Sequence, residues 1–162
     1  MTKANEYYAS VADDRNKWKR EQTRDGFLST CWVCGSRHDL IIHEMAKRSQ
    51  APNKWGERCN YFLACNTCNC DVLEDPTLTH QLAIKALRDP RHYDRQRVNV
   101  LRGRAPDAID YDDVLEAMTE IAFCALSKVL AGGANVDLTP VLKREGLYGN
   151  ADGFNPIFPR SL

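Results

Sequence analysis

Two cysteine pairs are the residues whose type and spacing point most directly to chemistry. Each pair is a Cys-x-x-Cys, thirty residues separate the pairs, and the four members are Cys31, Cys34, Cys65 and Cys68. Two such pairs supply the four thiolates of a tetrahedral, structural zinc site. The polar N-terminal residues lack the apolar segment of a secretory signal, so we expect a reducing compartment, where cysteines bind metal rather than form disulfides. The sequence therefore predicts one zinc ion per chain.

Three further cysteines lie outside these pairs. Cys70 is close enough in sequence to Cys68 to compete as a zinc ligand. Cys59 and Cys124 belong to no comparable pattern, and we interpret them as small apolar residues.

A group of polar residues lies between and directly after the cysteine pairs. His43 and Glu44 end a short apolar run, Asn60 stands five residues before the second pair, and Asn69 follows it directly. A zinc ion closed by four cysteines performs no reaction, so any chemistry must come from residues that it positions. The alternative for His43 is a strand residue hydrogen-bonded at the edge of a hairpin.

The order of these residues resembles that of the HNH endonucleases of the ββα-metal superfamily, in their zinc-stapled, four-cysteine, phage-type form. The family has a Cys-x-x-Cys, a strand ending in His-His or Asp-His, an asparagine five residues before a second Cys-x-x-Cys, and a His or Asn after the last cysteine. The matching stretches here are Ile-Ile-His43-Glu44-Met, Asn60-Tyr-Phe-Leu-Ala-Cys65 and Cys68-Asn69. The resemblance covers residues 27–75, with four features in the right order.

The resemblance implies hydrolysis of DNA phosphodiester bonds with one divalent cation, magnesium or manganese. In the family a histidine takes a proton from the attacking water, while the cation stabilises the leaving 3′ oxygen. The resemblance gives Asn60 the role of bracing the hairpin so that the histidine points correctly. It makes Asn69 the last ligand of the cation, and an amide oxygen is a hard donor suited to magnesium or manganese.

The histidine position departs from the family, which places a metal-binding Asp or His directly before the general-base His. Two registers, that is, two alignments of this stretch with the family pattern, are possible. In one register His43 is the base, and Ile42, which cannot bind a cation, takes the ligand position. In the other, His43 is the ligand and Glu44 replaces the base. We favour the second register because Ile42 and Met45 then occupy the apolar flanking positions. A carboxylate, with a reference pKa of about 4.3, is a weaker base at neutral pH than histidine.

Basic side chains are concentrated in the part of the chain that contains the cysteine pairs. Residues 1–104 contain 18 Lys and Arg against 13 Asp and Glu, whereas residues 105–162 contain 4 against 9. The asymmetry is compatible with a basic part that meets DNA and an acidic part that meets another subunit, in a homodimer or a larger assembly. Solvated basic loops are the alternative. The candidate phosphate-binding and base-stacking residues are Arg37, Lys47, Arg48, Lys54, Trp55 and Arg58.

Apolar periodicity and the positions of Gly and Pro predict a mostly helical chain around one short hairpin. The residues at 112–131 give the clearest amphipathic pattern. We expect helices over 5–24, ended by Gly26, and over 71–88, 91–101 and 112–131. We also expect a strand over 40–43, a second strand or a turn over 60–65, and a loop over 49–58. The predicted fold class is α+β, a small zinc-stapled ββα-metal module within a mostly helical chain. Its predicted segments are an N-terminal helix (1–26), the module (27–75) and a helical extension with an irregular C-terminal tail (76–162).

Two functions fit these observations. The first is a metal-dependent HNH-type DNA endonuclease, and the second is a catalytically degraded module that binds nucleic acid or a protein partner without cutting. No stretch approaches the roughly 18 uninterrupted apolar residues of a membrane helix, so we expect no membrane partner. The expected location is the cytoplasm of a bacterial host or a phage-infected cell.

Overall fold

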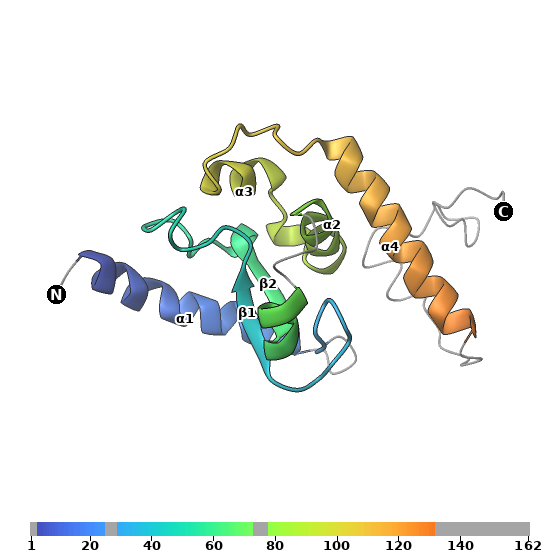
Figure 1. Ribbon diagram of the computed structural model, residues 1–162. Coiled ribbons are helices and arrows are strands. Elements are labelled where there is room, and N and C mark those ends of the chain that lie inside the picture. The colour runs from blue at the N-terminus through green and yellow to red at the C-terminus, as the bar shows by residue number, and fades with distance from the viewer. Residues whose placement is uncertain (1–2, 25–28, 73–77, 132–162) are drawn as a thin grey trace.

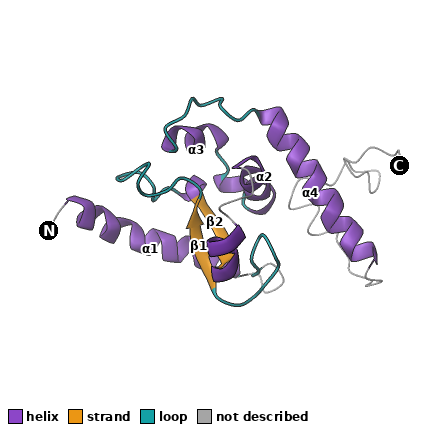
Figure 2. Ribbon diagram, in the orientation of Figure 1, coloured by secondary structure: helices purple, strands orange, loops and turns teal. Residues whose placement is uncertain are grey.

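The computed structural model describes residues 3–24, 29–72 and 78–131 as an α+β protein (Figure 1). In this part of the chain, helices surround one two-stranded antiparallel sheet (Figure 2), which confirms the expected class. None of the described helices is long and apolar enough to cross a membrane. The elements are α1 (Lys3–Thr23), β1 (Leu40–Glu44), η1 (Arg58–Asn60), β2 (Tyr61–Cys65), η2 (Cys68–Val72), α2 (Leu78–Arg88), η3 (Pro90–His92), α3 (Arg95–Leu101) and α4 (Tyr111–Ala131).

The observed elements follow the predicted ones closely, with one clear difference at α3. This helix begins at Arg95, four residues later than expected, because Pro90 starts a separate 3₁₀ turn. Asp94 then caps α3, its side chain accepting a hydrogen bond from the backbone N–H of Arg97 at 2.9 Å. The predicted stop at Gly26, the opening of α2 at 73–77 and the C-terminal tail lie outside the described residues.

The hairpin of β1 and β2 is the element that positions the candidate site. In its register His43 lies opposite Phe62, and Glu44 lies opposite Tyr61. β2 is buried along its whole length, whereas β1 is half-buried. Figure 1 shows α1 alongside the hairpin, with α2 on the other side and α4 outermost. Because successive strand residues point to opposite faces, His43 and Glu44 meet different neighbours.

An aromatic cluster joins α1 to the cysteine segment and to β2. The Trp18 ring centroid lies 5.8 Å from that of Trp32 and 5.4 Å from that of Tyr61, and the Trp32 centroid lies 5.0 Å from that of Phe62. All three pairs meet edge to face, an arrangement that adds about 0.5–1.5 kcal/mol per pair beyond burial. Residues from α2, α3 and α4 belong to the same core, so the three predicted segments share it.

Helix α4 coincides with the predicted amphipathic helix and packs on the outer side of α2 (Figure 1). Val114 and Ala117 are buried, and Met118 and Ile121 pack against the core. Leu115 is instead 39% exposed, because it is turned about 100° around the helix from Val114 and lies at the edge of the apolar stripe. The homodimer expected through this helix stays a prediction.

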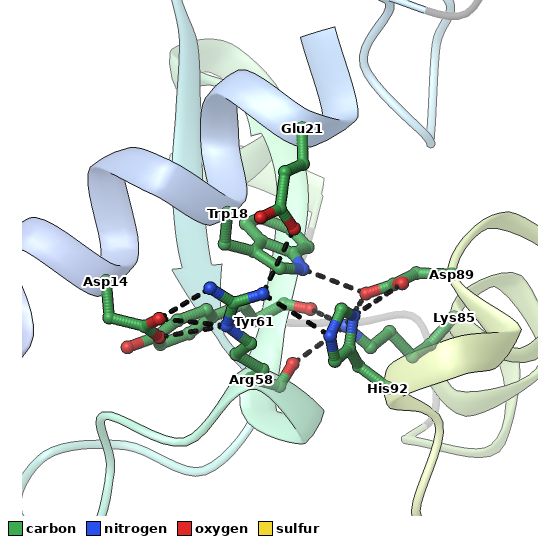
Figure 3. A network of polar contacts seen from close by, with 8 residues as sticks. All are labelled: Asp14, Trp18, Glu21, Arg58, Tyr61, Lys85, Asp89 and His92. Carbon is green, nitrogen blue, oxygen red and sulfur yellow. Dashed lines mark hydrogen bonds and ion pairs between the residues drawn. The ribbon is translucent and has the colours of Figure 1, made fainter. Parts of the chain in front are cut away.

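A buried polar network connects α1, the hairpin and α2 (Figure 3). The Nζ of Lys85, fully buried, donates to Asp89 Oδ2 at 2.7 Å and to the carbonyl oxygens of Arg58 and Tyr61, both at 2.8 Å. Asp89 also accepts from Trp18 Nε1 at 2.9 Å. Burial lowers the pKa of Lys85 to about 8, although the Asp89 carboxylate opposes this shift. All three ammonium protons have acceptors, so the network tolerates a charge in the core.

Replacing Lys85 by methionine is expected to lower the free energy of unfolding by about 3–5 kcal/mol. The change leaves the buried Asp89 carboxylate without its cation and two backbone carbonyls without a donor. Urea denaturation followed by circular dichroism measures the loss. Lys17→Met, at an exposed position on α1, is the matched control and should change stability by less than about 0.5 kcal/mol. Similar losses in both variants would contradict the role of the network.

A second ion pair, Glu57 with Arg97, joins the turn before β2 to α3. Arg97 Nε donates to Glu57 Oε2 at 2.7 Å, and Nη2 donates to the other carboxylate oxygen. The hydrogen bond from Arg97 lowers the pKa of Glu57 below its usual value, against the opposing effect of burial. The folded-state pKa is thus below the unfolded one, and the pair stabilises the fold at pH values above the unfolded pKa.

The stability supplied by this pair is expected to fall as the pH drops through the lowered pKa of Glu57. At pH 6, Glu57→Gln should cost about 0.5–1 kcal/mol, the range for a partly exposed pair. At pH 3.5 the difference between the parent and the variant should be smaller. This pH lies below the unfolded pKa, so Glu57 is largely protonated in the unfolded chain and must lose that proton to form the pair. Urea denaturation at both pH values tests this, with Glu116→Gln as an exposed control. An unchanged difference would contradict it.

Candidate functional site

The four paired cysteines converge on one point of the structure. Their sulfur atoms all lie within 4.8 Å of one another, and the Cys34 and Cys65 sulfurs are 3.7 Å apart. Thiolates bound to one zinc ion at about 2.3 Å lie about 3.8 Å apart at the corners of a tetrahedron, whereas disulfide sulfurs lie about 2.05 Å apart. The cluster, Cys31, Cys34, Cys65 and Cys68, can therefore hold a metal ion.

The local turns explain how the two pairs aim their sulfurs. In the first turn, Gly35 N donates to Cys31 O at 2.9 Å, and Cys31 N donates to Ser36 O at 2.7 Å. Gly35 has a φ of +77°, a left-handed conformation that glycine adopts without strain. In the second, Cys68 N lies 3.4 Å from the sulfur of Cys65 and donates to it. A thiolate that accepts a backbone N–H in this way is stabilised as a ligand.

The pKa values of thiols in this cluster are shifted in opposite directions. Burial opposes ionisation of Cys31, yet hydrogen bonds from the backbone of Cys34, Cys65 and Val33 lower its pKa to about 7. Burial and the neighbouring thiols raise the pKa of Cys68. Four thiolates so close together repel one another, and a coordinated cation removes that repulsion.

The other described cysteines stand apart from this cluster. Cys70, the expected competitor, has an exposed side chain 4.0 Å from Asn66 Oδ1 and is not part of the group. Cys59 packs against the core, and burial raises the pKa of its thiol to about 12, which agrees with its interpretation as a small apolar residue. The side chain of Cys124 lies outside the described part of the chain.

His43 and Asn69 meet beside the cysteine cluster. His43 Nδ1 lies 2.8 Å from Asn69 Oδ1, a hydrogen bond that the imidazole donates when Nδ1 is protonated. The position of Asn69 follows from η2, which begins at Cys68 and turns its next residue toward β1. Burial lowers the pKa of His43, opposed by the hydrogen bond to Asn69, the charge of Glu44 and a hydrogen bond to Gln81. The lowered pKa favours the neutral imidazole, the form that binds metal ions.

Asn60 is fully buried and braces the turn between the strands. Its Oδ1 accepts from Ala46 N at 2.6 Å, and its Nδ2 donates to the carbonyl oxygens of Ala46 at 3.1 Å and Trp55 at 2.9 Å. Met45 N donates to Asn60 O at 3.0 Å. These bonds fix the residues that directly follow Glu44, so Asn60 holds the end of β1 in place.

Glu44 points away from Asn69, toward α1. Its Oε1 lies 2.8 Å from Arg15 Nη2 and 3.1 Å from Arg48 Nη2. The carboxylate is thus paired with two guanidinium groups and does not complete the His43 and Asn69 pair in the free protein.

The structure divides the predicted nucleic-acid contacts into two groups. The side chains of Arg37, Lys47, Arg48 and Lys54 are exposed, as surface contacts require. Trp55 is only 1% exposed, packed with Val11 and Leu101, which is incompatible with the predicted base stacking. Arg58 pairs with Asp14 and Glu21 on α1, so its guanidinium belongs to the network of Figure 3 and not to a free basic surface.

Two residues near the site were not expected from the sequence. Gln81 is buried on α2 and forms a hydrogen bond with His43. It stands four residues before Lys85 on a helix face that is otherwise apolar. A polar residue at such a position can be detected in the sequence. Arg15 lies in a helix rich in charged residues and gives no comparable signal, because its partner Glu44 is far along the chain.

Comparison of the chain with protein-family models, curated proteins and solved structures finds no match. The geometry of the cysteine cluster and of the residues beside it is therefore the basis for assigning a function.

Proposed function

We propose that this chain is a metal-dependent endonuclease of the HNH type, which hydrolyses phosphodiester bonds in DNA. In this proposal a structural zinc ion bound by the four cysteines supports the hairpin and η2. The observation that carries it is the contact of His43 Nδ1 with Asn69 Oδ1 at 2.8 Å, which brings a strand residue and the residue after the last cysteine together. This is the juxtaposition that the resemblance to HNH endonucleases implies.

The donor atoms fit one divalent cation. Two ligands in adjacent octahedral positions around magnesium, each about 2.0–2.1 Å from the ion, lie about 2.8–3.0 Å apart. The measured separation of Nδ1 and Oδ1, 2.8 Å, falls in this range, and Nδ1 can bind a cation in the tautomer that carries the proton on Nε2. Magnesium keeps several waters, so two protein ligands are sufficient, and manganese accepts the same imidazole and amide donors. The arrangement supports the register in which His43 is a ligand, and that register leaves Glu44 as the candidate base.

In hydrolysis, a water oxygen forms a new bond to phosphorus as the bond from phosphorus to the 3′ oxygen breaks. The divalent cation, when bound, supplies Lewis-acid stabilisation of the charge on the phosphate and on the leaving oxygen. Glu44 accepts the proton of the attacking water after its carboxylate separates from Arg15 and Arg48. Asn60 keeps the end of β1 rigid, so that His43 and Glu44 stay at the same end of the strand.

The second candidate is a zinc-stapled module that binds nucleic acid without cutting it. One observation favours this alternative, the pairing of the Glu44 carboxylate with two arginines. If that pairing persists on DNA, the protein has exposed basic side chains for binding but lacks a proton acceptor next to the cation.

Incubation of the purified protein with supercoiled plasmid separates the two candidates. An endonuclease converts the plasmid into nicked or linear forms in magnesium or manganese, and not in buffer without added divalent cation. A binding module retards the plasmid on a gel and leaves it supercoiled under every condition. Retardation without cleavage would overturn the first candidate.

A further inference from the structure

The pairing of Glu44 differs from two pairs in which one arginine holds both oxygens of a carboxylate. Arg58 holds both carboxylate oxygens of Asp14, through contacts of 2.9 and 3.1 Å from Nε and 2.6 Å from Nη2. Arg97 holds both oxygens of Glu57. Arg15 and Arg48 instead share a single oxygen, Oε1 of Glu44.

A guanidinium has five N–H donors in a planar fork, and Arg15 and Arg48 each use one of them on Glu44. Two guanidinium charges stand against one carboxylate charge. The three groups therefore carry an excess of one positive charge. Such an arrangement suits an anion with several acceptor oxygens better than it suits one carboxylate oxygen.

An aromatic platform holds the two guanidinium groups. The Cζ of Arg48 lies 4.3 Å from the ring centroid of Trp55 and 5.3 Å from that of Tyr8, and the Cζ of Arg15 lies 5.2 Å from the Trp55 centroid. Buried Trp55 thus supports both arginines from beneath instead of stacking on a base. The cation–π contacts restrict the arginine side chains, so less entropy is lost when they bind a ligand.

Arg48 is exposed, Arg15 is partly buried, and both lie next to the candidate catalytic residues. The Arg48 side chain is 42% exposed and the Arg15 side chain 23% exposed, while Lys47, beside Arg48, is also exposed. Glu44 directly follows His43 in β1. A phosphate that reaches the two arginines is therefore at the end of the strand that carries His43.

We propose that Arg15 and Arg48 form a binding site for a backbone phosphate of nucleic acid, which Glu44 occupies as an internal counterion in the free protein. The inference rests on the proposed function. A phosphate displaces the carboxylate because it offers more acceptor oxygens to the two guanidinium groups. The displaced Glu44 carboxylate is then free to accept a proton. The cutting site thereby becomes complete only when substrate is bound.

The test measures binding separately from cleavage, by fluorescence anisotropy of a labelled DNA duplex without added divalent cation. Arg15→Gln and Arg48→Gln should each weaken binding roughly 5- to 10-fold and reduce the slope of log K against log salt by about 1. Arg20→Gln, with the same charge change at an exposed position of α1, should change the affinity less than twofold. Thermal unfolding checks that each variant is folded. Arg15→Lys keeps the positive charge but lacks the planar guanidinium donors, so it should lose an intermediate amount of DNA affinity.

Glu44→Gln gives the opposite and most specific outcome. Removal of the internal counterion should tighten DNA binding about 3- to 10-fold, compared with less than twofold for Glu6→Gln at an exposed position of α1. If Glu44 instead serves only to hold the arginines in place, its replacement should weaken binding as the arginine variants do. That result would overturn the proposal, as would equal affinities for Arg15→Gln and Arg20→Gln.

Inorganic phosphate, titrated by calorimetry, distinguishes a free anion from the DNA backbone. We expect the duplex to bind at micromolar concentration, with inorganic phosphate competing only at millimolar concentration or above. Tight binding of inorganic phosphate with no binding of DNA would overturn the assignment to nucleic acid. DNA binding through Arg15 and Arg48 without any plasmid cleavage would support this site while rejecting the endonuclease activity.

Discussion

Replacement of Cys65 by serine is expected to release zinc and to unfold the region around the hairpin. Cys65 is both a member of the four-cysteine cluster and the last residue of β2. Structural zinc ions in small domains contribute binding free energies of roughly 10–16 kcal/mol, and most of this is lost with one ligand. That loss is comparable with the whole stability of a typical domain, about 5–15 kcal/mol. The parent should contain one zinc per chain by elemental analysis, and the variant close to none.

Cys70→Ser is the matched control for this change. Cys70 is five residues from Cys65 and has the same side chain, but it is exposed and outside the cluster. Its replacement should leave the zinc content and the circular dichroism spectrum unchanged. A parent protein without zinc, or a Cys65→Ser protein that folds without metal, would show that the cysteines are unliganded core residues.

Replacement of His43 by alanine is expected to reduce plasmid cleavage at least 100-fold while zinc content and fold are retained. In one register the change removes the general base, worth about 10²–10⁴ in rate, and in the other it removes one of two protein ligands of the cation. The contact between Nδ1 and Asn69 Oδ1 favours the second case, in which excess manganese should partly restore the rate.

His38→Ala is the control, since His38 is exposed in the loop before β1. It should cleave at the rate of the parent. Equal rates for the parent and for His43→Ala would make His43 a strand histidine bonded to Asn69, with no part in catalysis. The Glu44→Gln variant distinguishes the register in which Glu44 is the base from the one in which His43 is the base, because it abolishes cleavage only in the first.

The candidate site depends on both local and long-range features. The spacing of the cysteines and of Asn60 is local information, because each Cys-x-x-Cys forms its own turn and Asn60 lies in the segment that it braces. The four cysteines come together as their spacing predicts. The mispredicted residues, Trp55 and Arg58, are an aromatic and a basic residue in a polar loop, where exposure is the natural expectation. Both are instead covered by α1, whose position the loop sequence does not encode.

The sequence by itself determined the four-cysteine cluster, the hairpin and the amphipathic helix, because these follow from residue spacing within short segments. The tertiary structure decided which charged side chains are free. Arg15, Asp14 and Trp18 reach the hairpin only because α1 packs along it, and Lys85 is buried only because α2 packs on the other side. The pairing of a charge depends on partners that are tens of residues away, and a pattern within one segment carries no information about them.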